Sequence, residues 1–283
     1  MPHQKGRKLA DSKLVVVIPA GPRDTPVDTL DSVFRYARPE LVIVIDDTKG
    51  AGIDFSHEKL VVLPSVGHDI FGGLYLNLAM AYRYAVENVQ FDMLLRLDTD
   101  ALLLGDGLAQ AAMSRFESNP KVGALGAYRL GPDGRHRDWK PARKALDAEI
   151  GIRGLRHPSC QRTLRTLVAS APGYIPGEHA LAAAVVYRGQ AINEMYRRGL
   201  LNLEGLASSR LGDDHIFGLL TVAAGYCTDD FSGPADPMAV KWKGLPSAPE
   251  DLLKTGKLVT HSVRSWGEMP EREIRDYFAA ARG

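Results

Sequence analysis

Apolar runs and amphipathic stretches alternate along the first hundred residues. Four runs are rich in Val, Ile and Leu, at 14–18, 41–45, 60–63 and 93–97. Such runs are typical of strands that are covered on both faces. Between them, apolar residues recur at helical spacing over 26–37 and again from about 72 to 88. Because strands separated by helices pair in parallel, the pattern predicts an α/β fold with a mostly parallel sheet flanked by helices.

The pattern becomes less regular beyond a further strand expected at 122–128. We expect helices, in chain order, at 141–168 with a break at 151–158, at 190–198, at 213–224 and at the chain end. Residues 180–187 fit a strand or a helix by composition, and 258–261 fit a short strand. Residues 234–249 contain four prolines without periodicity, which predicts a loop.

Polar residues follow the first, second and fourth predicted strands. The first ends in a loop at 19–24, the second in Asp46-Asp47, and the fourth in Asp98-Thr99-Asp100. In open α/β sheets, ligands bind in the crevice outside the carboxyl ends of the strands. We therefore expect these groups to converge on one edge of the sheet.

Asp98 and Asp100 are two residues apart, so at a strand end their side chains can point the same way. Two adjacent carboxylates repel each other unless a cation lies between them or one is protonated. Oxygen ligands suit Mg²⁺ or Mn²⁺. An isolated Asp-x-Asp is usually an exposed turn, but an apolar strand before it and three earlier strands favour a metal site.

The order of these features resembles the GT-A glycosyltransferases, in particular glycosyltransferase family 2. The resemblance covers roughly residues 13–130, and it depends on the order of four short motifs. These are Val17-Ile18-Pro19-Ala20, Val44-Ile45-Asp46-Asp47, a long helix at 72–88 with Gly73 and Asn77, and Leu97-Asp98-Thr99-Asp100. The resemblance implies a GT-A, Rossmann-like fold and transfer of a sugar from a nucleoside-diphosphate sugar to a hydroxyl acceptor.

The resemblance also implies roles for individual residues on the donor side. Pro19, Ala20 and Gly21 would line the nucleotide pocket, and Asp46 or Asp47 would accept the imide N–H of a uracil, with UDP the expected nucleotide. Asp98 would contact the ribose or donor sugar and the metal, and Asp100 would bind a Mn²⁺ or Mg²⁺ ion that bridges the diphosphate. Asp46-Asp47 also fits a turn stabilised by the aspartate side chains themselves.

Gly212-Asp213-Asp214 precedes an apolar helix, where members of the family often carry an acidic pair. One of these carboxylates would act as the general base toward the acceptor hydroxyl. The family commonly has Glu-Asp where this chain has Asp213-Asp214, so which residue acts stays open, and we favour Asp214. An Asp at a helix start is also a good N-cap, which is the structural alternative.

Basic and histidine residues near the C-terminus complete the implied site. His261 ends a short strand and would be a further metal ligand, while Lys243 and Arg264 would hold the pyrophosphate. Each of the three also fits an ordinary structural or surface role. Glu178-His179 either faces the acceptor or belongs to an ordinary loop.

The resemblance divides the chain into three parts. These are a flexible N-terminal tail at 1–12, a nucleotide-sugar-binding half at 13–130, and an acceptor-binding and catalytic half of the same domain at 131–283. The donor sugar, the acceptor, the choice between inversion and retention, and the oligomeric state are left open by these residues.

Composition excludes some classes of protein. The chain is 45% hydrophobic and 24% charged with a formal charge of +1, which argues against a nucleic-acid partner, so we interpret the cluster Arg162–Arg165 as a solvated helix face. Cys160 and Cys227 form no metal-type pair and suit a reducing compartment. The run 14–19 is too short for a transmembrane segment, so we expect a cytoplasmic enzyme, with peripheral membrane contact left open.

Two other enzyme classes compete with the transferase. A haloacid-dehalogenase-type phosphatase would use Asp98 as nucleophile and Gly212-Asp213-Asp214 for Mg²⁺, but its late acidic motif should end a strand, and a helix is expected here. A nucleotide-sugar pyrophosphorylase would need N–H donors in the loop at 19–24, and Pro22 has none. A nucleotide-binding scaffold without chemistry is the non-enzyme alternative.

Overall fold

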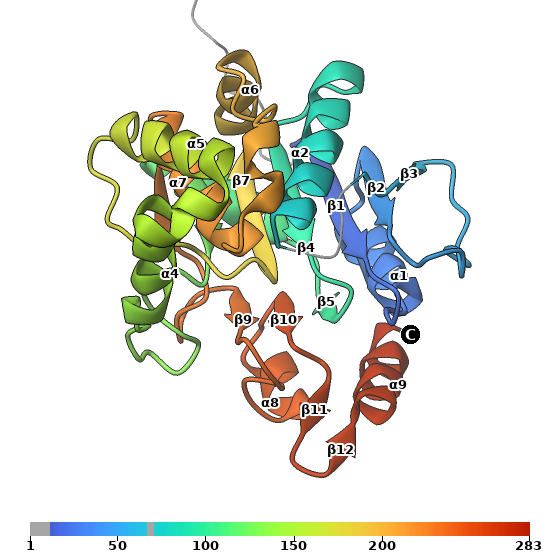
Figure 1. Cartoon of the computed structure of the whole chain (residues 1–283). Coiled ribbons are helices and arrows are strands. Elements are labelled where there is room, and N and C mark those ends of the chain that lie inside the picture. The colour runs from blue at the N-terminus through green and yellow to red at the C-terminus, as the bar shows by residue number, and fades with distance from the viewer. Residues whose placement is uncertain (1–11, 67–70) are drawn as a thin grey trace, which may run out of the picture.

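A seven-stranded mixed sheet forms the centre of the molecule, in the order β3-β2-β1-β4-β7-β6-β8 (Figure 1). The computed structural model describes residues 12–66 and 71–283, so nearly all of the N-terminal tail predicted at 1–12 lies outside the described residues. Neighbouring strands are parallel except at β7, which runs antiparallel to both β4 and β6. The predicted α/β fold with a mostly parallel sheet flanked by helices is confirmed.

The strands of this sheet are β1 (Leu14–Ala20), β2 (Leu41–Asp46), β3 (Leu60–Pro64), β4 (Met93–Leu97), β6 (Val122–Gly126), β7 (Ala184–Arg188) and β8 (Cys227–Asp230). The helices around it are α1 (Val27–Tyr36), α2 (Phe71–Asn88), α3 (Leu108–Ser118), α4 (Lys140–Ile150), α5 (Pro158–Ala169), α6 (Gly189–Arg197) and α7 (Asp213–Ala223). Two 3₁₀ turns, η2 (Ile152–Arg156) and η3 (Glu204–Ser208), lie among them.

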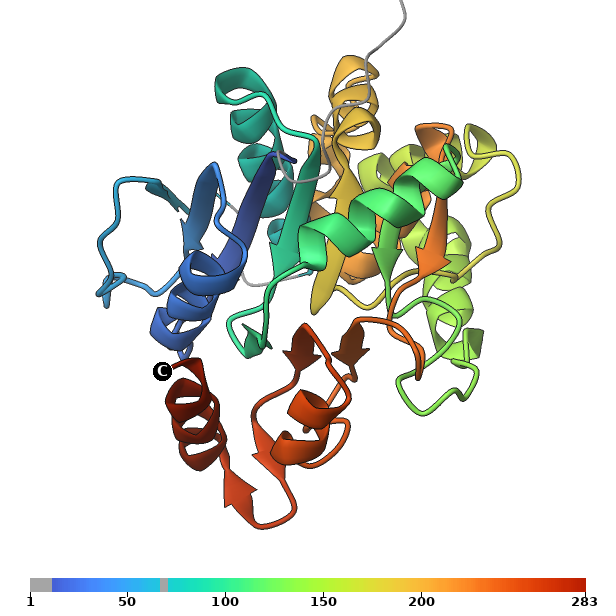
Figure 2. The ribbon, with the colours of Figure 1, turned by 180° about the vertical axis from the view of Figure 1, so that it is seen from behind.

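Helices cover both faces of the sheet, which explains why its central strands are apolar throughout. In β1, Val15 and Val17 belong to one buried cluster, while Val16 and Ile18 belong to the other. The first cluster includes residues of α2, α5, α6 and α7. The second includes residues of α1 and α3, which lie on the face of the sheet that is turned toward the viewer in Figure 2. The alternation follows from the period-2 geometry of a strand.

A smaller C-terminal unit packs at the carboxyl ends of β1 and β4 (Figure 1). It contains a three-stranded sheet in the order β5-β10-β9 and a β-ribbon. Its elements are β5 (Ala101–Leu103), β9 (Met238–Val240), α8 (Pro249–Lys254), β10 (Val259–His261), β11 (Ser265–Trp266), β12 (Met269–Pro270) and α9 (Glu271–Arg282). A third apolar cluster, including Leu102, Val263 and Phe278, holds the unit together. Strand β5 follows the loop at the end of β4, and β10 pairs with β5. Strand β10 therefore lies close to the end of β4.

The loop prediction for residues 234–249 is wrong in part, because β9 lies within it and pairs with β10. A three-residue strand has too few positions to show a period, and the flanking prolines hid it. Helices α3 and α8 and strands β5, β8, β11 and β12 were not predicted. Of the segment 180–187, predicted as strand or helix, residues 184–187 lie in strand β7 and residues 180–183 precede it. Over 12–66 and 71–283, no helix has the length and apolar character needed to cross a bilayer.

Candidate active site

A cavity of about 550 Å³ opens at the carboxyl ends of β1, β2 and β4. Its size is in the usual range for small-ligand sites. Its lining residues are Pro19, Ala20, Gly21, Asp24, Ile45, Asp47, Phe71, Leu74, Asn77, Asp98 and Arg210. The loop after β1, the end of β2 and the end of β4 thus meet as the sequence predicted. Because the sequence resemblance places the expected donor nucleotide at these strand ends, we call this space the donor cavity.

The two aspartates that end β2 have different surroundings. Asp46 Oδ1 accepts hydrogen bonds from the backbone N–H of Thr48 at 2.8 Å and from its hydroxyl at 2.6 Å. This is the turn that aspartate side chains commonly stabilise. Asp47 instead lines the donor cavity, and Asp46 is not among the lining residues. Of the pair, Asp47 is therefore the residue placed to meet a ligand.

Within residues 12–66 and 71–283, Asp98, Asp100 and His261 form the first of two carboxylate–histidine clusters. His261 Nε2 lies 3.1 Å from Asp100 Oδ1 and 3.9 Å from Asp98 Oδ2. One atom from each residue therefore faces a common point, within 4.8 Å of the other two. The pairing of β10 with β5 explains this approach, because it places His261 opposite Ala101, the residue after Asp100.

The second oxygen of each carboxylate is held by other groups. Asp100 Oδ2 accepts hydrogen bonds from Ser262 Oγ at 2.7 Å and from Arg264 Nε at 3.1 Å. Asp98 Oδ1 is 2.7 Å from Arg96 Nη1. The outer oxygens thus fix both side chains, and the inner oxygens are left facing His261.

The protonation of His261 is tied to this geometry. Its Nδ1 donates to the carbonyl of Lys241 at 2.6 Å, so Nε2 faces Asp100 either as a lone pair or with a second proton. A bare lone pair toward a carboxylate oxygen would be repulsive, so a proton or a cation must lie between them. Burial lowers the pKa of His261, but Asp100 and Asp98 outweigh burial and raise it above its ordinary value.

The groups around the cluster favour the ionised form of Asp100 more than that of Asp98. Burial acts to raise the pKa of Asp100, but His261, Ser262 and Arg264 outweigh it and hold the pKa well below its usual range. For Asp98 burial outweighs Arg96 and His261, so its pKa is raised. Asp100 is therefore the permanent anion of the cluster.

Arg264 and Lys243, the two expected pyrophosphate contacts, lie in different settings. Besides Asp100, Arg264 contacts Asp24 in the donor cavity at 3.0 Å and Glu271 on α9 at 3.2 Å. It thus ties the C-terminal unit to the loop after β1. Lys243 is exposed, and its ammonium group lies 4.8 Å from the ring centre of Trp242.

Arg96 joins the Asp98 side chain to the acidic pair at the start of α7. Its side chain is only 3% exposed, and it contacts Asp98 at 2.7 Å and Asp213 at 3.2 Å. It also donates to the carbonyl of Ala182. Burial raises the pKa of Asp213, with Arg96 acting in the opposite direction. Asp98 and Asp213, which belong to two separate predicted motifs, therefore share one guanidinium group, that of Arg96, which lies 117 positions before Asp213.

Asp214 belongs to the second cluster, with His179 and His215. Its Oδ2 is 3.3 Å from His179 Nε2, and its Oδ1 accepts the backbone N–H of His215 at 2.9 Å. Gly212 is the N-cap of α7 and no side chain caps the helix, so neither aspartate is the predicted N-cap. Burial acts to raise the pKa of Asp214, but His179 and His215 outweigh it and hold it well below its usual range.

The second cluster differs from the first in having a guanidinium group directed at its histidine nitrogen. Arg137 Nη2 lies 3.2 Å from His179 Nε2, the same nitrogen that faces Asp214. Burial lowers the pKa of Arg137 to about 10, which leaves it a cation at neutral pH. Burial and His179 lower the pKa of His215 to about 4, so His215 is neutral there.

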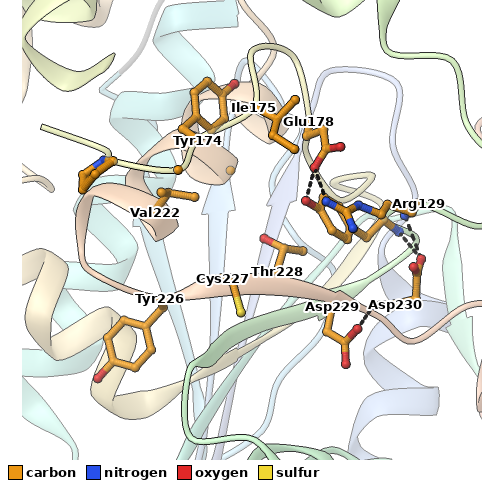
Figure 3. Close-up of a pocket in the computed structure, with 14 residues that line it drawn as sticks. Arg129, Tyr174, Ile175, Glu178, Val222, Tyr226, Cys227, Thr228, Asp229 and Asp230 are labelled. Atoms are coloured by element: carbon orange, nitrogen blue, oxygen red, sulfur yellow. Dashed lines mark hydrogen bonds and ion pairs between the residues drawn. The ribbon is translucent and has the colours of Figure 1, made fainter. Parts of the chain in front are cut away.

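A further cavity, of about 380 Å³, lies between β8, α7 and residues 172–178 (Figure 3). Glu178 accepts hydrogen bonds from the hydroxyl of Tyr128 and from Arg129. Asp230 Oδ1 accepts three backbone N–H groups, those of residues 128–130. Several of its polar groups are thus already paired within the protein, and none of its lining residues is shared with the donor cavity.

Two contributors to the site were missed by sequence reasoning. Arg96 lies within an otherwise apolar strand, and a lone charge in a buried strand is a usable signal because buried charges are almost always paired. Arg137 had no such signal, since its role depends on a contact with a residue 42 positions later.

No protein-family model matches this chain, and no curated protein matches its sequence. Solved structures resemble it in fold. A mannosyltransferase from Pyrobaculum calidifontis, in complex with GDP-Man and Mn²⁺, matches 81% of this chain with 16% identity and a TM-score of 0.41. This chain spans only 58% of that protein.

Two other solved structures are similar at comparable levels. A glycosyltransferase involved in glycosylation of the major capsid of PBCV-1 matches 95% of this chain and 99% of its own, with 10% identity and a TM-score of 0.46. Glucosyl-3-phosphoglycerate synthase from Mycobacterium tuberculosis matches 82% of this chain and 77% of its own, with 13% identity and a TM-score of 0.38. At these identities the likeness concerns the arrangement of the chain and not its chemistry.

Proposed function

We propose that this protein is a metal-dependent glycosyltransferase that moves a sugar from a nucleoside-diphosphate sugar to a hydroxyl acceptor. The observation that carries the proposal is the donor cavity beside the cluster of Asp98, Asp100 and His261. Residues 13–130 supply most of the donor side, and residues 131–283 supply His261, the acidic pair and the acceptor side. UDP is the proposed nucleotide, and Asp47 its partner at the base.

The residues of the first cluster fit a divalent cation. Cis ligands of an octahedral ion with bonds of about 2.1 Å lie about 3 Å apart, and His261 Nε2 and Asp100 Oδ1 are separated by 3.1 Å. The hydrogen bond from His261 Nδ1 to a backbone carbonyl is the usual support for a metal-binding histidine. A bound Mn²⁺ or Mg²⁺ would supply Lewis-acid stabilisation of the diphosphate leaving group.

The chain's own groups have separate tasks in this proposal. Pro19, Ala20 and Gly21 shape the nucleotide pocket, and Arg264 lies where it can exchange its carboxylate partners for phosphate oxygens. Asp214 is ionised and accepts the acceptor's hydroxyl proton as general base. Arg96 holds Asp98 and Asp213 in register, so that the donor and the base keep one geometry. Lys243 is exposed enough to reach the diphosphate from the C-terminal unit.

The two competing enzyme classes fit this geometry less well. The late acidic motif of a phosphatase of this type should end a strand, but Asp213-Asp214 begins helix α7. A pyrophosphorylase loop needs free N–H donors, but the N–H of Gly21 is bonded to Asp24 Oδ2 at 2.8 Å. The phosphate-wrapping loop that this class requires is therefore poorly supplied with donors.

The test is an assay of nucleoside diphosphate release from a panel of nucleotide sugars with Mn²⁺ or Mg²⁺. We expect slow, metal-dependent hydrolysis of one donor, abolished in Asp100→Asn. Asp106→Asn is the matched control, because Asp106 is exposed and outside the cluster. Phosphate release from simple monoesters that is lost in Asp98→Asn would instead support the phosphatase. If no nucleotide binds in the presence of metal, the transferase proposal fails.

A further inference from the structure

A cavity of about 440 Å³ lies between α4, η2 and η3. Its charged lining is dominated by arginines. The residues that matter here are Glu149, Ile152, Arg153, Arg156, His157 and Arg210. We call this space the arginine pocket. It lies within the most basic part of the chain: residues 135–165 contain nine Lys and Arg against three Asp and Glu, whereas the whole chain carries a formal charge of only +1.

The guanidinium groups of the arginine pocket have no bonding partner among the described residues. Among residues 12–66 and 71–283, no hydrogen bond or ion pair joins the side chains of Arg153, Arg156 or Arg210 to another group. The one carboxylate present, Glu149, accepts hydrogen bonds from Ser209 Oγ at 2.8 Å and from the backbone N–H of Arg210. The three arginines are exposed, and because Glu149 already accepts hydrogen bonds from other groups, their positive charges make the pocket suited to an anion.

Arg210 connects the arginine pocket to the proposed chemistry. It lines both this pocket and the donor cavity. It is four residues before Asp214, so their Cα atoms are at most about 14 Å apart even in a fully extended chain. Glu149 and the N–H of Gly72, which donates to the carbonyl of Ser209 at 2.9 Å, fix the backbone on this stretch. A molecule anchored at Arg210 can therefore present a hydroxyl group to Asp214.

The cavity of Figure 3 offers a different environment. Its charged residues are Arg129 against Glu178, Asp229 and Asp230, a lining that disfavours an anion. The arginine pocket has the opposite charge and is the one that reaches the donor cavity. Its rim also carries exposed apolar side chains, since Ile152 is 86% and Leu155 63% exposed on the same 3₁₀ turn.

We propose that the arginine pocket binds the phosphate group of the acceptor, so that the acceptor substrate is a phosphorylated hydroxyl compound. Arg153 and Arg156 pair with the phosphate oxygens, and Arg210 orients the group toward the donor cavity. Bidentate pairing of arginine with phosphate supplies both affinity and orientation. The inference rests on the proposed glycosyl transfer for the role of the phosphate, but the binding of an anion can be measured without it.

The experiment measures binding to the full chain in two arms that distinguish the source of the phosphate. The first arm titrates glycerol 1-phosphate by calorimetry, with glycerol as the uncharged reference. The second measures sedimentation with vesicles of phosphatidylcholine containing phosphatidic acid, with pure phosphatidylcholine vesicles as reference. Each is repeated with the double variant Arg153→Gln/Arg156→Gln. Arg162→Gln is the control, because Arg162 is an exposed arginine of the same basic segment outside the pocket.

We expect one phosphate probe to bind and its dissociation constant to rise about tenfold or more in the double variant. The Arg162→Gln control should change it less than twofold. Binding of glycerol 1-phosphate identifies a soluble phosphate, and binding of the phosphatidic acid vesicles alone identifies a lipid phosphate. If neither probe binds, or if Arg162→Gln weakens binding as much as the double variant does, the proposal is overturned.

A parallel titration with UDP and Mn²⁺ separates this inference from the proposed function. If the phosphate probe binds and UDP does not, the pocket stands as an anion site and the transferase proposal fails. If UDP binds and the phosphate probes do not, the transferase stands and the arginine pocket is not its acceptor site. Arg210→Gln, tested last, should weaken binding of the phosphate probe as the double variant does; an unchanged affinity would remove Arg210 from the site.

Discussion

The two carboxylate–histidine clusters of this protein are alike in size and differ in charge. Asp98, Asp100 and His261 bring two carboxylates to one imidazole, whereas Asp214, His179 and His215 bring one carboxylate to two. In the first, the inner oxygens face the histidine nitrogen, and their arginine partners lie on the outer oxygens. In the second, Arg137 points at the nitrogen that a metal would need.

That difference explains why similar side chains are assigned different chemistry. A surplus of carboxylate charge attracts a cation, so the first cluster suits a divalent metal. In the second cluster the charge of Asp214 is already balanced by Arg137, and burial keeps His215 neutral. An ionised carboxylate that holds no metal can take up a proton, which is the task of a general base.

The largest expected effect is on turnover in Asp214→Asn. Loss of the base should reduce kcat by about a thousandfold, while the affinity for nucleoside diphosphate and Mn²⁺ changes less than twofold. Steady-state kinetics with the identified donor and acceptor, together with calorimetry, check both parts. A loss of metal affinity in this variant would contradict the separation of the two clusters.

Replacing Arg96 should destabilise the fold, because Asp98 and Asp213 share its guanidinium group. Arg96→Met leaves the buried Asp213 and the half-buried Asp98 without their shared partner, and breaking such a pair costs about 3 kcal/mol. Urea denaturation measures the free energy of unfolding. The control is Arg115→Gln, whose half-exposed pairs with Asp229 and Asp236 should contribute less than about 1 kcal/mol. Equal losses in the two variants would remove the special role of Arg96.

Metal binding to the first cluster should depend on pH through His261. Asp100 and Asp98 raise the pKa of His261 above its ordinary value despite burial. In the metal-free protein, Nε2 therefore stays protonated to a higher pH than in a free histidine side chain. A metal must displace that proton. Below the raised pKa the apparent Mn²⁺ affinity should therefore fall by about tenfold per pH unit, and above it the affinity should level off. Titrations from pH 5 to pH 8.5 test this, and a flat profile would be inconsistent with His261 as a ligand.

The smallest expected effect, an unchanged number of bound metal ions, is predicted for a substitution in the second cluster. His179→Asn should leave the number of Mn²⁺ ions bound per chain unaltered, because Arg137 already occupies the approach to this cluster. His261→Asn should remove the tightly bound ion, which makes it the comparison variant. Equilibrium dialysis gives both counts. Loss of an ion in His179→Asn would show that the second cluster also binds metal.

Local patterns predicted the parts of the site that lie at strand ends. The apolar runs of β1, β2 and β4 were evident in the sequence, so the positions of Pro19, Asp47 and Asp98 at one edge followed from the geometry of parallel sheets. The separation of Asp46 from Asp47 could not be predicted, because it depends on which side chain closes the turn with Thr48.

The remaining parts depend on contacts between distant segments. His261 reaches Asp100 because β10 pairs with β5, a three-residue strand without any sequence signal. The arginine pocket forms where α4, η2 and η3 meet, so the basic segment alone resembled a solvated helix face. For Arg162, which is exposed, that interpretation agrees with the structure. Contacts between distant segments determine where these side chains lie, and the hydrophobic periodicity within one segment carries no information about such contacts.

The most direct test of the central claim is electron–nuclear double resonance on Mn²⁺ bound to the protein together with UDP. A metal held by His261 and bridging the diphosphate predicts coupling to one imidazole ¹⁴N and to ³¹P in the same sample. The nitrogen coupling should disappear in His261→Asn and persist in His179→Asn. Absence of the phosphorus coupling, or a nitrogen coupling that survives in His261→Asn, would contradict a nucleotide–metal site at Asp98, Asp100 and His261.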